Sequence, residues 1–388
     1  MDDWLTADQA QTALGVRPQT LYAYVSRGRI EARPSASDPR KSLYRAADIS
    51  RLVSRKAQGR GAAVVAEAAI AWGEPVLPSA ITTVDRGRLF YRGRDAAALA
   101  EDQSLEAVAR LLRGGDGASL KPGLATTSPT AGATGRARAF ALLAQRAAVD
   151  AGARGRAPLA LAAEAAGLLD QLADAVAGRA GNGLIHQRLA AAWGQDAEGA
   201  DLIRRSLVLL ADHELNASTF AARVAASTGA SLAACALAGL SALSGPLHGG
   251  MAARVEALVD EARRQGAQAA VAARLAQGAL IAGFGHPLYR GGDPRALALL
   301  EQFVLPRPFQ ALRHAAESAT GEIANIDFAL TALAATQGLP PDAPFLLFAV
   351  GRCAGWLAHA LEQARSGQLI RPRARYVGAA LQYEPGAA

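Results

Sequence analysis

The chain has 388 residues, of which 51% are apolar and only 5% are aromatic. This length excludes a single minimal domain and fits two or three, and the apolar share is enough to bury a large core. Because the apolar mass is mainly Ala and Leu, the composition favours closely packed helices over a β-sandwich. Two cysteines, Cys235 and Cys353, do not make a disulfide framework and indicate reduced core thiols in a cytoplasmic protein.

The net charge of +7 is concentrated near the N-terminus. Residues 1–60 contain eleven basic and six acidic side chains, so +5 of the net charge lies in this part. Such an asymmetry suggests a module that faces nucleic acid, joined to a nearly neutral body. The first residues are acidic, and no uninterrupted apolar run is long enough to cross a bilayer. We therefore expect neither a signal peptide nor a membrane span.

Two short helices around a glycine turn are predicted near the N-terminus. Thr6 can cap a helix over residues 7–14, and Pro18 stands at the start of a second helix. Residues 29–45 are basic and contain prolines, which is typical of a wing or hairpin, and residues 48–55 form a third short helix. The second helix presents polar groups that can meet base edges and phosphates, namely Gln19, Thr20, Tyr22 and Arg27.

This region resembles the winged helix-turn-helix of the excisionase and MerR type. The resemblance covers residues 1–57 and implies binding to double-stranded DNA. The alternative is a solvated basic module that packs on the body or on a partner, and serves protein contacts or allosteric control.

The rest of the chain is expected to be almost entirely helical. Residues 57–61 look like a linker, and residues 113–134 form a loop rich in Gly, Ala, Thr and Ser. Strand-like alternation over residues 80–84 and 88–92, on either side of a turn, predicts a hairpin. Helical patterns cover residues 160–178, 201–216, 232–243, 252–263, 327–336 and 345–365.

Three segments of the second half each place one acid/base side chain in a stretch bent by glycine or proline. They are residues 244–250 with His248, residues 283–289 with His286, and the segment around Asp327. Glycine lets the backbone turn sharply and approach a ligand closely. Two imidazoles and a carboxylate on such turns form a set that can move protons. The alternative is that each histidine only fills a turn.

Other polar residues of the second half suit an anionic ligand. His213 lies in a polar stretch at a helix junction, and Arg295 follows His286 closely, where its planar fork could hold a carboxylate. Arg352 stands within an apolar helix and is costly to bury unless an anion pairs with it. The alternatives are helix caps around His213 and a structural ion pair for Arg352. Absent motifs argue against a P-loop, a dinucleotide site and a zinc site, so no metal is expected.

Together these segments resemble the citrate synthase family from about Leu77 to the C-terminus. The matching segments follow the family's order, and they are DRG with YRG (85–93), DHELNASTF (212–220), SGPLHGG (244–250), GFGHPLY with DPR (283–295), NIDF (325–328), GRCAGWLAH (351–359) and RPRARY (371–376). The resemblance implies an all-α fold with a large and a small helical domain around a cleft, in a homodimer. We therefore expect a module over 1–57, a linker over 58–63, a large domain over 64–249 and 340–388, and a small domain over 250–339.

The resemblance also assigns roles. Asp327 corresponds to the base that removes a proton from acetyl-CoA, His248 to the group that stabilises the enol, and His286 to the acid that protonates oxaloacetate. The carboxylates of the substrate would be held by His213, Arg295 and Arg352 and, across the dimer interface, by Arg371. No cofactor is implied, because acetyl-CoA is a substrate.

Three functions remain open at this point. The first is condensation of acetyl-CoA with oxaloacetate to give citrate and CoA. The second is 2-methylcitrate synthesis from propionyl-CoA. The third is a DNA-binding regulator that uses the synthase body as a metabolite sensor. The presence of His248, His286 and Asp327 together favours chemistry, because a sensor would need only the groups that hold the anion.

Overall fold

The structure is a computed structural model that describes residues 4–26, 28–35, 38, 41–57, 77–115, 133–374 and 376–379, with side chains to 52 in the helix that ends at Ala57. The chain separates into two compact units. One comprises Met1–Pro78 with Pro372–Ala388, and the other comprises Ser79–Arg371. The predicted linker and most of the loop over 113–134 lie outside the described residues.

The described residues of the N-terminal unit form three helices and one small sheet. The helices are α1 (Ala7–Leu14), α2 (Pro18–Ser26) and α3 (Ala46–Ala57). The strands β1 (Trp4–Leu5), β2 (Ala32–Pro34) and β3 (Ser42–Arg45) pair antiparallel in the order β1-β3-β2. The Thr6 hydroxyl accepts the backbone N–H of Gln9, so the predicted cap of α1 is confirmed. A small core closes the unit, formed by Ala10, Leu14, Leu21, Ile30, Tyr44 and Ile49.

In the part that the structure describes, the second unit is a helical body with one small sheet at its start. The predicted hairpin is confirmed as β4 (Thr82–Asp85) and β5 (Arg88–Tyr91), and β6 (Arg94–Asp95) extends it. The helices that follow are α5 (Ala96–Asp102), α6 (Leu105–Leu112), α7 (Gly135–Val149), α8 (Pro158–Ala177), α9 (Ile185–Ala192), α10 (Ala197–Leu210), α11 (Ala217–Ser227), α12 (Leu232–Leu243), α13 (Met251–Gln265), α14 (Ala267–Ala276), α15 (Pro294–Leu300), α16 (Arg307–Thr320), α17 (Ile326–Gln337) and α18 (Ala343–Ser366).

The fold is mostly helical, as the composition predicts, but the expectation of an all-α protein is wrong in detail because both units contain a small sheet. The sheets form where aromatic and β-branched residues alternate on either side of a turn, as in β4 and β5. The helix predicted over 201–216 ends earlier, at Leu210. Beyond this end, the Asn216 side-chain amide donates to the His213 and Glu214 carbonyls, and the Asp212 side chain contacts the distant His359.

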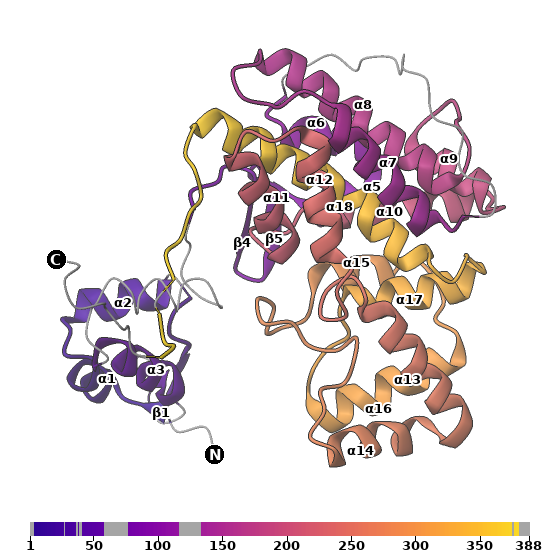
Figure 1. Ribbon diagram of the computed structural model, residues 1–388. Coiled ribbons are helices and arrows are strands. Elements are labelled where there is room, and N and C mark those ends of the chain that lie inside the picture. The colour runs from indigo at the N-terminus through magenta and orange to yellow at the C-terminus, as the bar shows by residue number, and fades with distance from the viewer. Residues whose placement is uncertain are drawn as a thin grey trace. The chain divides into compact units, whose positions relative to one another are not determined.

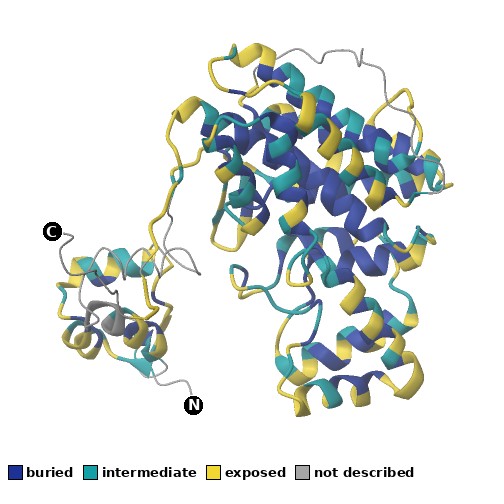
Figure 2. Ribbon diagram, viewed as in Figure 1, coloured by how far each residue is buried: buried dark blue, intermediate teal, exposed yellow. Residues whose placement is uncertain are grey.

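Helix α18 lies at the centre of the body and packs against α6, α8, α10, α11 and α12 (Figure 1). Helices α13, α14 and α16 contact one another at one end of the body, and α17 contacts both α13 and α18. By length and composition, α18 is long and apolar enough to cross a membrane. However, its apolar window is completely buried within the body, as is usual for a core helix (Figure 2).

Candidate functional site

Hydrogen bonds join the segment that carries His286 to the start of the helix that carries Asp327. The backbone N–H of Asn325 donates to the Gly283 carbonyl at 2.9 Å, and the Asn325 side-chain amide donates to the Gly285 carbonyl at 3.0 Å. Both glycines have positive φ, 85° and 75°, which side chains rarely tolerate. The bent segment therefore holds His286 beside the N-terminus of α17, although the two stretches are far apart in sequence.

Asp293 strengthens this junction. Its carboxylate accepts two hydrogen bonds from the Arg295 guanidinium, at 2.9 Å from Nε and 2.8 Å from Nη2. It also accepts the backbone N–H of Arg295, at the start of α15, and that of Ile326, at the start of α17, both at 3.1 Å. One buried carboxylate thus fixes the start of both helices and the direction of Arg295.

His213 lies in a compact aromatic cluster with His286 and Tyr289. The His213 and His286 rings meet edge to face with centroids 5.1 Å apart, and Tyr289 packs on His286 with centroids 4.8 Å apart. The Tyr289 hydroxyl lies 2.8 Å from Nε2 of His213. The Arg295 guanidinium carbon stands 5.7 Å from the centre of the Tyr289 ring, so the predicted anion-binding arginine borders the same cluster.

His248 is held by a hydroxyl on one side and an aromatic ring on the other. Its Nε2 lies 2.9 Å from the Ser218 hydroxyl, and its ring meets Phe348 edge to face with centroids 5.6 Å apart. The Ser218 hydroxyl donates to the side-chain oxygen of Asn216 at 2.7 Å, its oxygen accepts from the Trp356 indole at 3.1 Å, and Nε2 of His248 competes with Asn216 for the Ser218 proton. When the single Ser218 proton goes to Nε2 of His248, the imidazole proton lies on Nδ1.

Arg352 is the buried cation with the fewest partners in the site. It is 1% exposed, its Nε donates to the Leu210 carbonyl at 2.9 Å, and its Nη2 is buried without a partner. No carboxylate among the described residues forms an ion pair with it. Burial lowers its pKa to about 10, and the charge of Asp212 opposes that shift. A buried guanidinium with a vacant donor is suited to receive an anion.

Burial and neighbouring positive charge keep the three histidines neutral. Burial, followed by the fields of Arg352 and Arg295, lowers the pKa of His248 to about 3. Burial and Arg295 lower the pKa of His286 to about 4. The pKa of His213 lies well below its ordinary value, again because of burial and then the two arginines. Each ring therefore has one nitrogen that donates and one that accepts at physiological pH.

Asp327 occupies the first turn of α17 and is half-buried. Burial raises the pKa of its carboxyl to about 7, Arg295 and Arg352 oppose the rise, and Asp293 adds to it. Within the described residues, no hydrogen bond reaches the carboxylate. A carboxylate with so high a pKa is a stronger base than an exposed one and is a candidate for acid/base work.

The predicted site residues converge around the two arginines. The charges of Arg295 and Arg352 both act on His213, His248 and Asp327, which come from three different segments of the chain. Arg371 follows α18 in exposed chain and forms no hydrogen bond or ion pair with a described residue.

In the N-terminal unit, Gln19 and Tyr22 are exposed on α2 and Thr20 is half-buried. Arg27, the fourth residue named there, lies outside the described residues.

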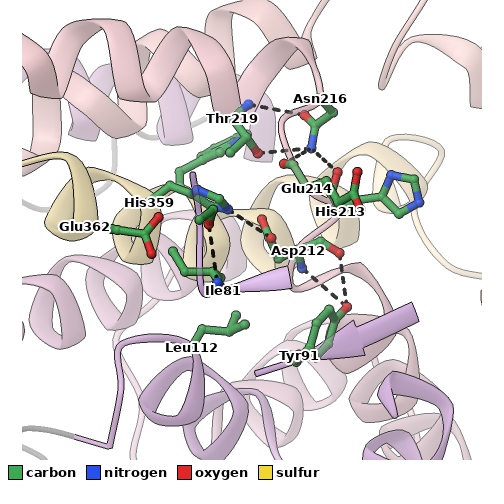
Figure 3. Close-up of polar contacts among 12 residues, drawn as sticks. Ile81, Tyr91, Leu112, Asp212, His213, Glu214, Asn216, Thr219, His359 and Glu362 are labelled. Atoms are coloured by element: carbon green, nitrogen blue, oxygen red, sulfur yellow. Dashed lines mark hydrogen bonds and ion pairs between the residues drawn. The ribbon is translucent and has the colours of Figure 1, made fainter. Parts of the chain in front are cut away.

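A buried polar network lies behind His213. His359 contacts Asp212 through Nε2 at 3.1 Å and Arg223 through Nδ1 at 3.3 Å. A guanidinium can only donate, so Nδ1 of His359 accepts and Nε2 donates to Asp212. The Tyr91 hydroxyl donates to the Asp212 carbonyl at 3.2 Å. Figure 3 shows the His213 ring pointing away from this network, which therefore fixes the turn without touching the ring.

Sequence reasoning missed several residues of the site. Ser218 and Asn216 belong to the helix caps expected around His213, and Asn216 does cap α11, but both also support His248. Asp293 and Tyr289 lie within the motif segment 283–295, but the sequence predicted no role for either residue. The density of polar residues over 212–220 is the sequence feature that could have indicated a role in the site for Ser218 and Asn216.

Comparisons with known proteins indicate the family of the chain. The family model described as "Citrate synthase, C-terminal domain" matches residues 124–373, more than half of the chain. Citrate synthase 2 of Bacillus subtilis (strain 168) is 37% identical over 189 residues, covering 46% of this chain and 51% of that protein. A 2-methylcitrate synthase of Mycobacterium tuberculosis (strain H37Rv) is 33% identical over 224 residues, covering 54% and 57%.

The fold is also that of solved structures. The crystal structure of citrate synthase from Thermotoga maritima MSB8 superimposes with a TM-score of 0.65 at 27% identity, covering 81% of this chain and 96% of that one. The chain spans about half the length of the curated relatives it matches in sequence. With a family match over most of its helical body, the chain belongs to the citrate synthase family.

Proposed function

We propose that the chain condenses an acyl-CoA with oxaloacetate, giving a tricarboxylate and free CoA. The observation that supports this most directly is Arg352, a fully buried guanidinium with a vacant donor beside neutral histidines and a carboxylate of raised pKa. A substrate with two carboxylates would fill that vacancy and offset the positive charge. Arg295 and His213 would hold the remaining carboxylate oxygens, and Arg371 of a second copy would complete the site in a homodimer.

Carbon–carbon bond formation needs a base and two donors. Asp327 would take the α-proton of the thioester, and His248, neutral and held by Ser218, would donate from Nδ1 to the oxygen that becomes enolate. A thioester α-proton is a very weak acid, so removal requires both groups at once.

His286 would act on the ketone of oxaloacetate. Its Nδ1 accepts the backbone N–H of Leu288 at 3.2 Å, so the neutral ring carries its proton on Nε2. That proton would polarise the ketone and pass to its oxygen as the new bond forms. Water then hydrolyses the thioester to release CoA, and no cofactor is required.

The relatives include both citrate and 2-methylcitrate synthases, so acetyl-CoA and propionyl-CoA are both candidates. The test is release of CoA thiol from each acyl-CoA in the presence of oxaloacetate. We expect release with at least one of them, reduced at least 100-fold in Asp327→Asn, and unchanged in the exposed control Asp260→Asn. Binding of oxaloacetate without thiol release would favour the metabolite-sensor alternative.

A second function is supported by the N-terminal unit. Three helices with an antiparallel sheet, and an exposed α2 carrying Gln19 and Tyr22, are the parts of a winged helix-turn-helix, and we propose that it binds duplex DNA. Arg33 on β2 stacks on Trp4, with its guanidinium carbon 4.0 Å from the ring centre, and adds positive charge to the sheet. The buried thiols of Cys235 and Cys353 suit a cytoplasmic location for both activities.

Salt dependence tests the DNA proposal. The affinity of the full chain for duplex DNA should fall steeply as salt rises, because phosphate contacts release counterions. Gln19→Ala with Tyr22→Ala should weaken binding, whereas Gln265→Ala at the end of α13 should not. A flat salt response would leave the unit with a role in protein contacts.

A further inference from the structure

We propose that Tyr289 is a positioning residue that fixes the proton of His213 on Nδ1, so that this nitrogen donates to a carboxylate of the keto-diacid. The inference deepens the proposed function and rests on it, because it takes His213 as a carboxylate-binding group.

Tyr289 is placed to act on His213 alone. Its side chain is 3% exposed, and its hydroxyl oxygen lies 2.8 Å from Nε2 of His213. Across the described parts of the chain, the hydroxyl has no other hydrogen-bonding partner. The tyrosine ring is held in place by His286, with centroids 4.8 Å apart, and by Arg295, 5.7 Å from the ring centre. The hydroxyl therefore cannot turn far from the imidazole.

The direction of this hydrogen bond follows from the available partners. If His213 donated from Nε2, the hydroxyl hydrogen of Tyr289 would be buried with no protein acceptor, which is unfavourable. If the hydroxyl donates to Nε2, both groups are satisfied and the imidazole proton lies on Nδ1. Burial raises the pKa of Tyr289, so the hydroxyl keeps its proton to donate.

The other nitrogen of His213 is left for a ligand. Nδ1 of His213 makes no hydrogen bond to any described group. It is also not one of the completely buried nitrogen or oxygen atoms that lack a partner, so a ligand can reach it. Arg295 and Arg352 act on the same ring. With the proton on Nδ1, the ring adds a donor to two guanidiniums. With the proton on Nε2, it would present a lone pair to a carboxylate and repel it.

The test is Tyr289→Phe in the whole 388-residue chain. Without the hydroxyl, the ring can take either tautomer, so we expect KM for oxaloacetate to rise roughly tenfold while kcat changes less than about threefold. In a His213→Asn background the same substitution should add no further change to KM, because the hydroxyl acts through the imidazole. Tyr24→Phe in the N-terminal unit is the control and should leave both constants unchanged.

Nitrogen NMR of the six histidines provides a readout independent of turnover. The His213 signal is identified by its loss in His213→Asn, and we expect Nδ1–H in the wild type and a tautomer mixture in Tyr289→Phe. Three results would each overturn the proposal. They are Nε2–H in the wild type, a fall in kcat alone in Tyr289→Phe, and additive effects on KM in the double variant. Absence of condensation in a wild type that shows Nδ1–H would instead count against the proposed function alone.

Discussion

The Asp293 carboxylate and the Arg295 guanidinium form a two-point ion pair, at 2.9 Å and 2.8 Å, in which neither side chain is more than 3% exposed. Although burial alone would raise the pKa of Asp293, Arg295 holds that pKa below its ordinary value. The same carboxylate accepts the N–H that opens α17, where Asp327 follows. This pair therefore couples the direction of an anion-binding group to the position of the candidate base.

Removing the charge of Asp293 should destabilise the protein strongly. In Asp293→Asn the buried Arg295 loses its counter-charge, and we expect a loss of about 3–5 kcal/mol in the free energy of unfolding, measured with urea. Asp260→Asn is the matched control. Its partner Arg263 lies at 2.7 Å, but both side chains are at least half exposed, so the loss should be about 0.5 kcal/mol or less. Similar losses in the two variants would contradict this account.

The pH dependence of turnover should report on Asp327. A general base works only when deprotonated, so kcat/KM should rise with pH through about 7, the pKa to which burial raises this carboxyl. Titration of His286 and His248 should not change kcat/KM in this pH range, because their pKa values are about 4 and 3. The measurement is initial rates of thiol release across this range. A profile that is flat or falls with rising pH would exclude Asp327 as the base.

The same carboxyl should lower stability at neutral pH. Its pKa is about 7 in the folded protein against an ordinary 3.8, so the folded state holds the proton to higher pH than the unfolded state. Wild-type stability therefore falls as pH rises from about 4 to about 7. Asn does not titrate, so Asp327→Asn should gain on the order of 1–3 kcal/mol relative to wild type above pH 7, allowing for partial exposure. Thermal unfolding at pH 5 and pH 8 would reveal this, and a variant less stable than wild type at pH 8 would refute it.

Gly355 permits the close approach of α18 to the turn that carries Asp212. Its backbone N–H donates to the Ala211 carbonyl at 2.9 Å. A Cβ at this position would lie 2.6 Å from that carbonyl oxygen and closer still to Oδ1 of Asp212. Gly355→Ala should therefore cost about 1–3 kcal/mol or more of unfolding free energy, and should also reduce turnover.

Gly167, inside α8, is the control for Gly355, because a Cβ there meets nothing within 4 Å. Gly167→Ala should stabilise the protein by about 0.5–1 kcal/mol through helix propensity. Equal effects of the two substitutions in urea unfolding would show that the close packing at Gly355 is unimportant.

Local features were predictable to differing degrees. The cap at Thr6 and the helix over Leu232–Leu243 were predicted closely, because capping and periodicity depend on neighbours in sequence. The early end of α10 was not, because it depends on contacts with distant segments, such as that of the Asp212 side chain with His359. The apolar composition of α18 is also explained by the tertiary structure, because the surrounding body buries the apolar window of this helix completely.

By itself, the sequence determined the helical class, the order of the motifs and the identity of the side chains that handle protons and anions. These depend on composition, spacing and local turns. Only the tertiary structure decided that Arg352 has no acidic partner among the described residues, that Asp293 supports two helix starts, and that Tyr289 meets His213. The physical reason is that these contacts join side chains that are far apart in the sequence. Such side chains lose their water and find one another only when the separate segments pack together.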